Sequence, residues 1–285
     1  MPIFTAPDGT RLAHHLRGDG EPLVVLPGGP MRASAYLGDL GGLAAHRRLV
    51  LLDLRDTGDS AVPADPATYR CDRQVDDVEA LRAHLGLERI DVLGHSAGGS
   101  LAAPYAARHP GRVARLALIT TALRPLGLRA TAEDRLAAAR LRREEPWFDT
   151  AYPALEAWLA GEGEYDPACT PFFYGRWNET VRAHADADDE QTNDEAADRY
   201  FTESAYDPDA TRTALSELTA PVLVLAGGLD GGPRPDLARR AAAAFGPAEF
   251  AVQPGAGHYP WVDDPQWFVR RVAALFADAA PPSAR

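Results

Sequence analysis

The sequence predicts an α/β fold with a mostly parallel, eight-stranded sheet, helices on both faces and an inserted helical cap. Between residues 22 and 120, short apolar runs alternate with stretches of helical periodicity, a pattern typical of a parallel sheet. Residues 125–218 interrupt this alternation, because they contain no strand-like run. A tight turn, Gly94-His95-Ser96-Ala97-Gly98, links an apolar run directly to an alanine-rich helix and carries a serine at its apex.

The elements of the first half follow from local signals. The expected strands are apolar runs at residues 3–5, 11–16, 22–26, 47–52, 90–93 and 113–119. Asp8-Gly9 is a hairpin signal, so the first two strands are expected to be antiparallel. Apolar side chains at helical spacing predict a helix over residues 72–85, which Gly86 ends, and a second helix follows Ser96.

The second half returns to the alternating pattern after residue 218. Strands are expected at residues 221–226 and 249–252, and helices at residues 235–245 and 264–279, before a frayed tail. The sequence therefore predicts a core domain of residues 1–124 and 219–285. The helical cap is expected to comprise residues 125–218.

Composition restricts the chemistry. All 29 basic residues are arginine, which excludes lysine Schiff bases, a Ser–Lys dyad and a P-loop. A net charge of −12 disfavours nucleic acid or an anionic membrane as a partner. Cys71 and Cys169 lie far apart without metal-ligand spacing, so free thiols and no metal site are expected, with a disulfide between them as the alternative. The sequence contains no leader-like or membrane-spanning apolar run, so we expect a cytoplasmic protein.

Ser96 is the candidate nucleophile. A serine at the apex of so sharp a turn has a strained backbone, and glycine is needed at positions 94 and 98 because a Cβ there would collide with the adjoining elements. The helix that follows directs its free N–H groups toward any negative charge formed at the hydroxyl. The alternative is a glycine-rich turn with an idle serine.

A serine hydroxyl needs a base and a carboxylate that orients the base. His258 is the candidate base, because it follows the last expected strand in a glycine-rich loop. Asp230 is the candidate acid, because it follows the preceding strand. The loop after residue 119 offers no carboxylate in Thr120-Thr121-Ala122, which leaves Asp230 as the acid in the expected chain order.

An oxyanion hole requires two N–H donors. Ala97, directly after the nucleophile, is one candidate. The second is expected in Pro27-Gly28-Gly29-Pro30, where the prolines have no N–H. We expect Gly29 to donate and Gly28 to lie against the substrate. A plain turn after a strand is the alternative.

From Asp8-Gly9 to the final helix, the chain resembles the α/β-hydrolase superfamily. Within it, the chain is most similar to the proline iminopeptidase-like group. The resemblance rests on Pro27-Gly28-Gly29-Pro30, residues 53–60, residues 94–100, Gly228-Leu229-Asp230 and Gly255-Ala256-Gly257-His258. Pro27 and Met31 stand where the group has histidine and glycine, and Ala97 stands where its peptidases often have tryptophan. These differences weigh against a peptidase and keep an esterase open.

The resemblance implies that cap glutamates bind the N-terminal ammonium of a substrate. Glu179, Glu195 and Glu203 are the candidates, and Trp177 is expected among the aromatic residues that face the pocket. The alternative for the glutamates is a solvated acidic face, because residues 186–198 are acidic throughout.

The sequence as a whole predicts a serine hydrolase that cleaves a small amide or ester through an acyl-enzyme. A proline iminopeptidase-like aminopeptidase leads, without a metal or organic cofactor and with a small molecule or short peptide as its partner. A carboxylesterase or lactonase, a C–C bond hydrolase and a non-catalytic ligand-binding protein are the alternatives. The oligomeric state does not follow from the sequence.

Overall fold

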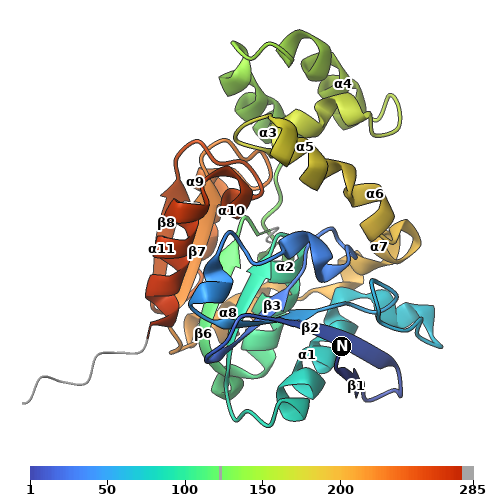
Figure 1. The fold of residues 1–285 in the computed structure, drawn as a ribbon, viewed down its shortest axis with the longest axis vertical. Coiled ribbons are helices and arrows are strands. Elements are labelled where there is room, and N and C mark those ends of the chain that lie inside the picture. Colours follow the sequence, from blue (N-terminus) through green and yellow to red (C-terminus); the bar gives the residue numbers. More distant parts are fainter. Residues whose placement is uncertain (122–123, 278–285) are drawn as a thin grey trace, which may run out of the picture.

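The computed structural model describes residues 1–121 and 124–277 and is built on an eight-stranded sheet (Figure 1). In spatial order the strands are β1 (Ile3–Thr5), β2 (Arg11–Arg17), β4 (Arg48–Leu52), β3 (Pro22–Leu26), β5 (Ile90–His95), β6 (Val113–Ile119), β7 (Val222–Gly227) and β8 (Ala248–Gln253). β2 pairs antiparallel with β1 and with β4, and every other neighbouring pair is parallel. This arrangement confirms the predicted fold class.

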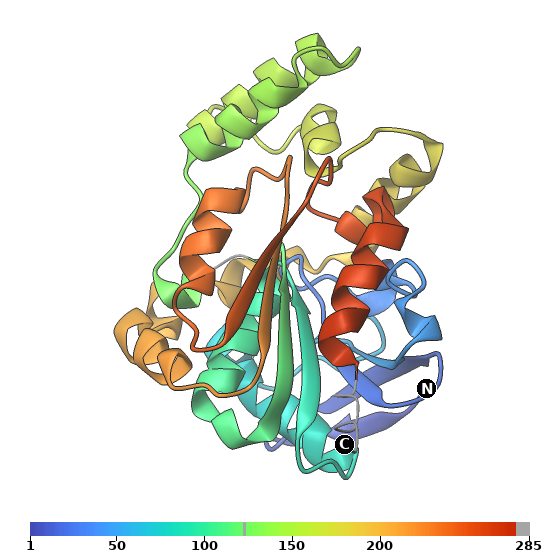
Figure 2. The ribbon, with the colours of Figure 1, turned by 90° about the vertical axis from the view of Figure 1, so that its left-hand side faces the viewer.

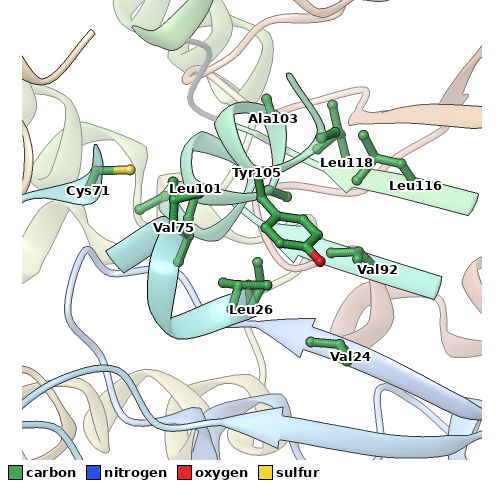
Figure 3. Close-up of a cluster of buried hydrophobic side chains, with 14 of the residues drawn as sticks. Val24, Leu26, Cys71, Val75, Val92, Leu101, Ala103, Tyr105, Leu116 and Leu118 are labelled. Carbon is green, nitrogen blue, oxygen red and sulfur yellow. The ribbon is translucent and has the colours of Figure 1, made fainter. Parts of the chain in front are cut away.

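Helices cover both faces of the sheet. The helices that flank it are α1 (Cys71–His84), α2 (Ala97–Arg108), α9 (Pro235–Ala242), α10 (Pro260–Asp263) and α11 (Pro265–Phe276). Figure 2 shows α9 and α11 on opposite sides of the sheet. Successive strand residues point to opposite faces, so Val24 joins the apolar cluster under α1, α2 and α9, while Leu23 joins the cluster under α11. Figure 3 shows part of the first cluster, with Tyr105 of α2 between strand residues.

Residues 124–218, which precede β7, are mostly helical. We call them the helical segment and the other described residues the body. The helices of the helical segment are α3 (Ala132–Ala139), α4 (Phe148–Ala160), α5 (Glu179–Asp186), α6 (Asp188–Gln191), α7 (Asp194–Tyr200) and α8 (Pro208–Ser216). Part of it has its own apolar cluster, formed by Ala139, Ala151, Leu155, Cys169 and Phe172. By contrast, α8 belongs to the packing of the body, because Leu215 is buried in the cluster under α1 and α2. The exact division into a core and a cap stays a prediction.

The last helix differs from its expected range. It begins at Pro265, and Asp264 caps it by accepting a hydrogen bond from the Trp267 amide at 3.0 Å. It is described to Phe276, and the expected frayed tail lies outside the described residues. Cys71 and Cys169 are both buried free thiols. Among the described residues, no helix combines the length and apolar character that a membrane span requires.

Candidate active site

Ser96 stands alone between β5 and α2. Its backbone is in the left-handed region, with φ 51° and ψ −116°, which side chains rarely adopt. A Cβ on Gly94 would lie 2.7 Å from the Gly98 carbonyl oxygen, and one on Gly98 would lie 2.1 Å from the Leu26 carbonyl oxygen. The glycines are therefore required by close packing on both sides of the turn. The Ser96 side chain is thereby held at the end of the strand, where it lines a cavity.

The structure brings Ser96, His258 and Asp230 together in one hydrogen-bonded line. The Ser96 Oγ lies 2.8 Å from the His258 Nε2, and the His258 Nδ1 lies 2.8 Å from the Asp230 Oδ2. The second Asp230 oxygen accepts a hydrogen bond from the Gly232 amide at 2.8 Å. Because a carboxylate can only accept, the His258 Nδ1 donates, and the Nε2 is left to accept the serine proton. This geometry suits proton transfer from the serine hydroxyl to the imidazole.

The sheet topology explains why residues so far apart in the chain meet here. Ser96 follows β5, Asp230 follows β7 and His258 follows β8. The carboxyl ends of parallel strands share one edge of a sheet, so the three loops converge. The His258 backbone is also fixed, because its amide donates to the Phe173 carbonyl at 2.7 Å and its carbonyl accepts from the Thr120 hydroxyl at 2.8 Å.

Two backbone amides near Ser96 are available to a developing negative charge. Within the described residues, the amides of Gly29 and Ala97 have no hydrogen-bond partner, and Ala97 is the first residue of α2. The Gly28 amide is already occupied, because it donates to the Tyr36 hydroxyl at 2.7 Å. Gly29 has φ 114°, and a Cβ there would lie 2.7 Å from the Arg32 amide nitrogen. Gly29 and Ala97 are therefore the two donors that this arrangement offers.

Comparison with known proteins agrees with this architecture. The profile of a family described as alpha/beta hydrolase fold matches residues 21–265. The protein belongs to this family. The resemblance read from its motifs is therefore confirmed.

Relatives of this α/β hydrolase include peptidases and esterases. It is 38% identical to the proline iminopeptidase of Heyndrickxia coagulans over 96 residues, which are 34% of this chain and 33% of that protein. The alignments with the curated proline iminopeptidases span about a third of the length of those proteins.

Two solved structures match almost the whole chain. The proline iminopeptidase of Mycobacterium smegmatis has a TM-score of 0.71 at 25% identity, covering 96% of this chain and 98% of that one. A thermophilic esterase from Thermogutta terrifontis has a TM-score of 0.68 at 25% identity, covering 96% and 97%. The comparisons identify the family, but the relatives include both peptidases and an esterase, so the substrate must be inferred from the site.

A buried chain of hydrogen bonds connects the Gly28 amide with the carbonyl oxygen of His258. The Gly28 amide donates to the Tyr36 oxygen, the Tyr36 hydroxyl lies 2.6 Å from the His95 Nδ1, and the His95 Nε2 lies 3.0 Å from the His258 carbonyl oxygen. Burial, with a further contribution from His258, holds the pKa of His95 well below its usual range. Neutral His95 therefore accepts from Tyr36 and donates to His258. This chain of hydrogen bonds thus links the glycine loop, residues 27–32, to the backbone of the candidate base His258.

Arg32 joins the same loop to the helical segment. Its side chain is only 1% exposed, and its guanidinium lies 2.8 Å from the Gln191 Oε1 and 2.6 Å from Asp188. The guanidinium also lies over the Tyr36 ring, 4.5 Å from its centroid. His184 of the helical segment lies 3.1 Å from the Tyr36 carbonyl oxygen, and burial followed by the charge of Arg32 lowers its pKa to about 4. A buried cation thus ties the glycine loop to α6.

Above Ser96 lies a cavity of about 920 Å³ between the body and the helical segment. Gly29, Ala97 and His258 line it, and so does Trp177, as the sequence predicts for an aromatic residue facing the pocket. Gly28 is not among the described lining residues, so the expected contact between Gly28 and substrate finds no support.

The glutamates expected to bind substrate are placed differently from the expectation. Glu179 is exposed at the start of α5, and Glu195 is exposed and pairs with Arg199 at 3.0 Å. Neither is among the described lining residues. The Glu203 side chain lies outside the described part of the structure. Glu195 is on the outer face of α7, whereas Asp194, one residue earlier, lines the cavity.

Charged side chains of both signs line this cavity. Besides the Arg32–Asp188 pair, the acidic lining residues are Asp186, Asp189 and Asp194. The basic ones are Arg124, Arg129 and Arg135. The acidic groups come from α5 to α7 and the basic groups from residues 124–135, so the two signs belong to different stretches of the helical segment.

One group of potential metal ligands occurs among the described residues, at His15, Asp53 and Asp59. Asp53 already accepts hydrogen bonds from the amide and hydroxyl of Ser34 on one oxygen. Its other oxygen accepts from the Asp59 amide and lies 2.8 Å from the His15 Nε2. These contacts satisfy the carboxylate and give it a structural role in the loop after β4.

Proposed function

We propose that this protein is a serine hydrolase that works through an acyl-enzyme. The observation that carries the proposal is the line from the Ser96 Oγ through His258 to Asp230, with two 2.8 Å contacts. The line ends beside the two available amides of Gly29 and Ala97. A nucleophile, a base, an orienting carboxylate and two oxyanion donors together form the constellation that acyl transfer requires.

In the first half-reaction the Ser96 Oγ attacks the substrate carbonyl carbon, and the His258 Nε2 takes the hydroxyl proton. The carbonyl oxygen becomes an oxyanion that accepts hydrogen bonds from the Gly29 and Ala97 amides. The intermediate then collapses, the bond to the leaving group breaks, and His258 returns its proton to that group. Asp230 keeps the imidazole in the required tautomer and stabilises its charged form.

In the second half-reaction water replaces the leaving group. His258 takes a proton from the water as its oxygen attacks the acyl carbon. The acyl–serine bond then breaks, and His258 returns the proton to the Ser96 Oγ. Hydrolysis thus regenerates the enzyme without an external redox or metal partner in any step.

The leading substrate is a small compound with a free N-terminal prolyl or aminoacyl group. Similarity to two proline iminopeptidases supports it. The cavity supplies acidic groups suited to an ammonium, although they are Asp186, Asp189 and Asp194 rather than the expected glutamates. In this proposal the aspartates bind the substrate's ammonium while Ser96 attacks the adjoining carbonyl.

A carboxylic ester is the second candidate. It is favoured by similarity to the Thermogutta terrifontis esterase and by the exposed positions of Glu179 and Glu195. The same acyl-enzyme chemistry serves both bonds, so the choice depends on what the cavity walls recognise.

A paired assay of the purified full chain separates the two candidates. One arm contains proline p-nitroanilide and the other p-nitrophenyl acetate and butyrate, each with wild type and Ser96→Ala. Ser96-dependent release of the anilide supports an aminopeptidase. Ester cleavage without anilide cleavage supports an esterase. Turnover of either kind that persists in Ser96→Ala contradicts the proposed mechanism.

A further inference from the structure

One wall of the cavity carries positive charge that the proposed mechanism does not use. Arg124 belongs to a short helical turn, η5 (Arg124–Leu126), and Arg135 belongs to α3. The Arg124 guanidinium lies over the Phe201 ring, 4.2 Å from its centroid. The Arg135 guanidinium packs against Gly232, since a Cβ there would lie 2.9 Å from the Arg135 Cζ. The Gly232 amide in turn holds the carboxylate of Asp230. Arg135 on this wall therefore lies beside the loop that carries Asp230.

These two arginines lack the partner that arginine usually finds. Within residues 1–121 and 124–277, neither forms an ion pair, whereas Arg140 and Arg142 of the same segment pair with Glu133 and Glu145. Both are partly buried. Burial, followed by repulsion from Arg129 and Arg135, lowers the pKa of Arg124. A partly buried cation among like charges is stabilised by an anion that binds between them.

The opposite charge lies on other elements. The acidic lining residues belong to the chain from α5 to α7, and no ion pair joins them to Arg124 or Arg135 within the described residues. Figure 2 shows η5 and the chain leading up to α3 on the left, and α5 on the right. Ser96 lines the same cavity. A ligand that satisfies both walls carries a cation at one end and an anion at the other.

We propose that Arg124 and Arg135 form a carboxylate-binding subsite, and that the substrate is a short zwitterionic peptide whose leaving group ends in a free carboxylate. This inference rests on the proposed aminopeptidase function, because the ammonium of the acyl part is assigned to the acidic wall. The carboxylate then belongs to the part released after Ser96 attacks. Arginine suits this task because its planar guanidinium donates two parallel hydrogen bonds to a carboxylate.

The test compares prolyl-alanine with prolyl-alaninamide, which differ only in the charge of the leaving group. Release of proline gives kcat/KM for each. Wild type should prefer the acid by about tenfold or more, because a charge-assisted contact with a carboxylate is lost in the amide. The double variant Arg124→Gln/Arg135→Gln should reduce the acid-to-amide ratio to about one. Arg143→Gln, at an exposed arginine outside the cavity, should keep the wild-type ratio.

Binding tests the subsite without requiring peptide hydrolysis. Titration calorimetry on wild type should give N-acetylalanine about tenfold higher affinity than N-acetylalaninamide, and the double variant should bind the two equally. If neither peptide is cleaved but this preference is present, the aminopeptidase assignment fails and the carboxylate subsite stands. Equal binding of acid and amide by wild type, or a preference that survives in the double variant, overturns the subsite.

Discussion

The body and the helical segment are stabilised in different ways. In the body, strands β3, β5, β6 and β7 are almost entirely buried between helices, and the proposed catalytic residues lie on loops directly after strands. The helical segment has a small apolar cluster, and its contact with the glycine loop runs through polar groups, above all Arg32. The proposed catalytic residues thus follow strands of a buried sheet, while most of the charged groups that line the cavity belong to the helical segment.

This difference predicts that substitutions in the two regions change different quantities. Changes at the strand ends should affect the rate of the chemical step. Changes in the helical segment should affect substrate preference and local stability.

Loss of the nucleophile should have the largest effect. Ser96→Ala should lower kcat by about a million-fold, because no other group can form the acyl-enzyme, and Asp230→Asn should lower it by about ten-thousand-fold through the wrong imidazole tautomer. Stopped assays on whichever substrate is cleaved measure both. The melting temperature of Ser96→Ala should stay close to that of wild type. If the variant without Ser96 retained a substantial rate, the reaction would not depend on this residue of the body.

Matched cavities in the two regions test the difference in packing. Leu101 in α2 is fully buried under the sheet, whereas Leu155 in α4 belongs to the small cluster of the helical segment. Leu101→Ala should lower the free energy of unfolding by about 4 kcal/mol, and Leu155→Ala by about 2 kcal/mol, because the smaller cluster relaxes more easily. Urea unfolding followed by circular dichroism gives both values. Equal losses would mean that the two regions are packed equally tightly.

Tyr36 lies where the body contacts the helical segment, and its substitution should have an intermediate effect on kcat and on stability. Tyr36→Phe removes the hydroxyl between the Gly28 amide and the His95 ring, leaving two buried groups unpaired. We expect a loss of about 2 kcal/mol in stability and a fall of about tenfold in kcat, because the adjoining Gly29 amide loses its support. Tyr152→Phe, which removes a contact with Arg140 in the helical segment, is the control and should leave kcat unchanged. A wild-type kcat in Tyr36→Phe would argue against this support.

The smallest predicted effect is a dependence of stability on pH. Burial lowers the pKa of His14 and of His184 to about 4, from an ordinary value of 6.5. Between pH 6.5 and 4 the unfolded chain therefore binds more protons than the folded one, and the free energy of unfolding falls as the pH falls. His14→Gln in the body and His184→Gln in the helical segment should each remove about 1 to 2 kcal/mol of the difference between pH 7 and pH 5. Chemical unfolding at the two pH values measures this difference, with His46→Gln, at an exposed position, as the control. An unchanged difference in either variant would mean that the histidine is protonated equally in both states.

The sequence predicts the sheet correctly, and it proposes Ser96, Asp230 and His258 as a triad, because both inferences depend on local constraints. The glycines around Ser96 are required by contacts with the adjoining backbone, and Asp230 and His258 follow recognisable apolar strands. Such signals lie within a few residues of one another, so a single sequence carries them.

The supporting groups and the cavity walls depend on contacts between distant parts of the chain. Arg32 meets Gln191 across 159 positions, and no pattern around either residue indicates the pairing. The phase of α7 decides that Asp194 lines the cavity while Glu195 points outward, and an acidic run gives no such phase. Arg124 and Arg135 likewise become neighbours only when η5 and α3 come together at the same cavity.

In the proposed mechanism Ser96 is an activated nucleophile, and covalent labelling detects such a serine without knowledge of the substrate. Purified protein is treated with a fluorophosphonate, which phosphonylates an activated serine oxygen with loss of fluoride, and intact-mass and peptide mass spectrometry then locate the adduct. We expect one adduct per chain on Ser96, formed far more slowly in His258→Ala. An unlabelled Ser96, or labelling that is equally fast in His258→Ala, would contradict the proposed mechanism.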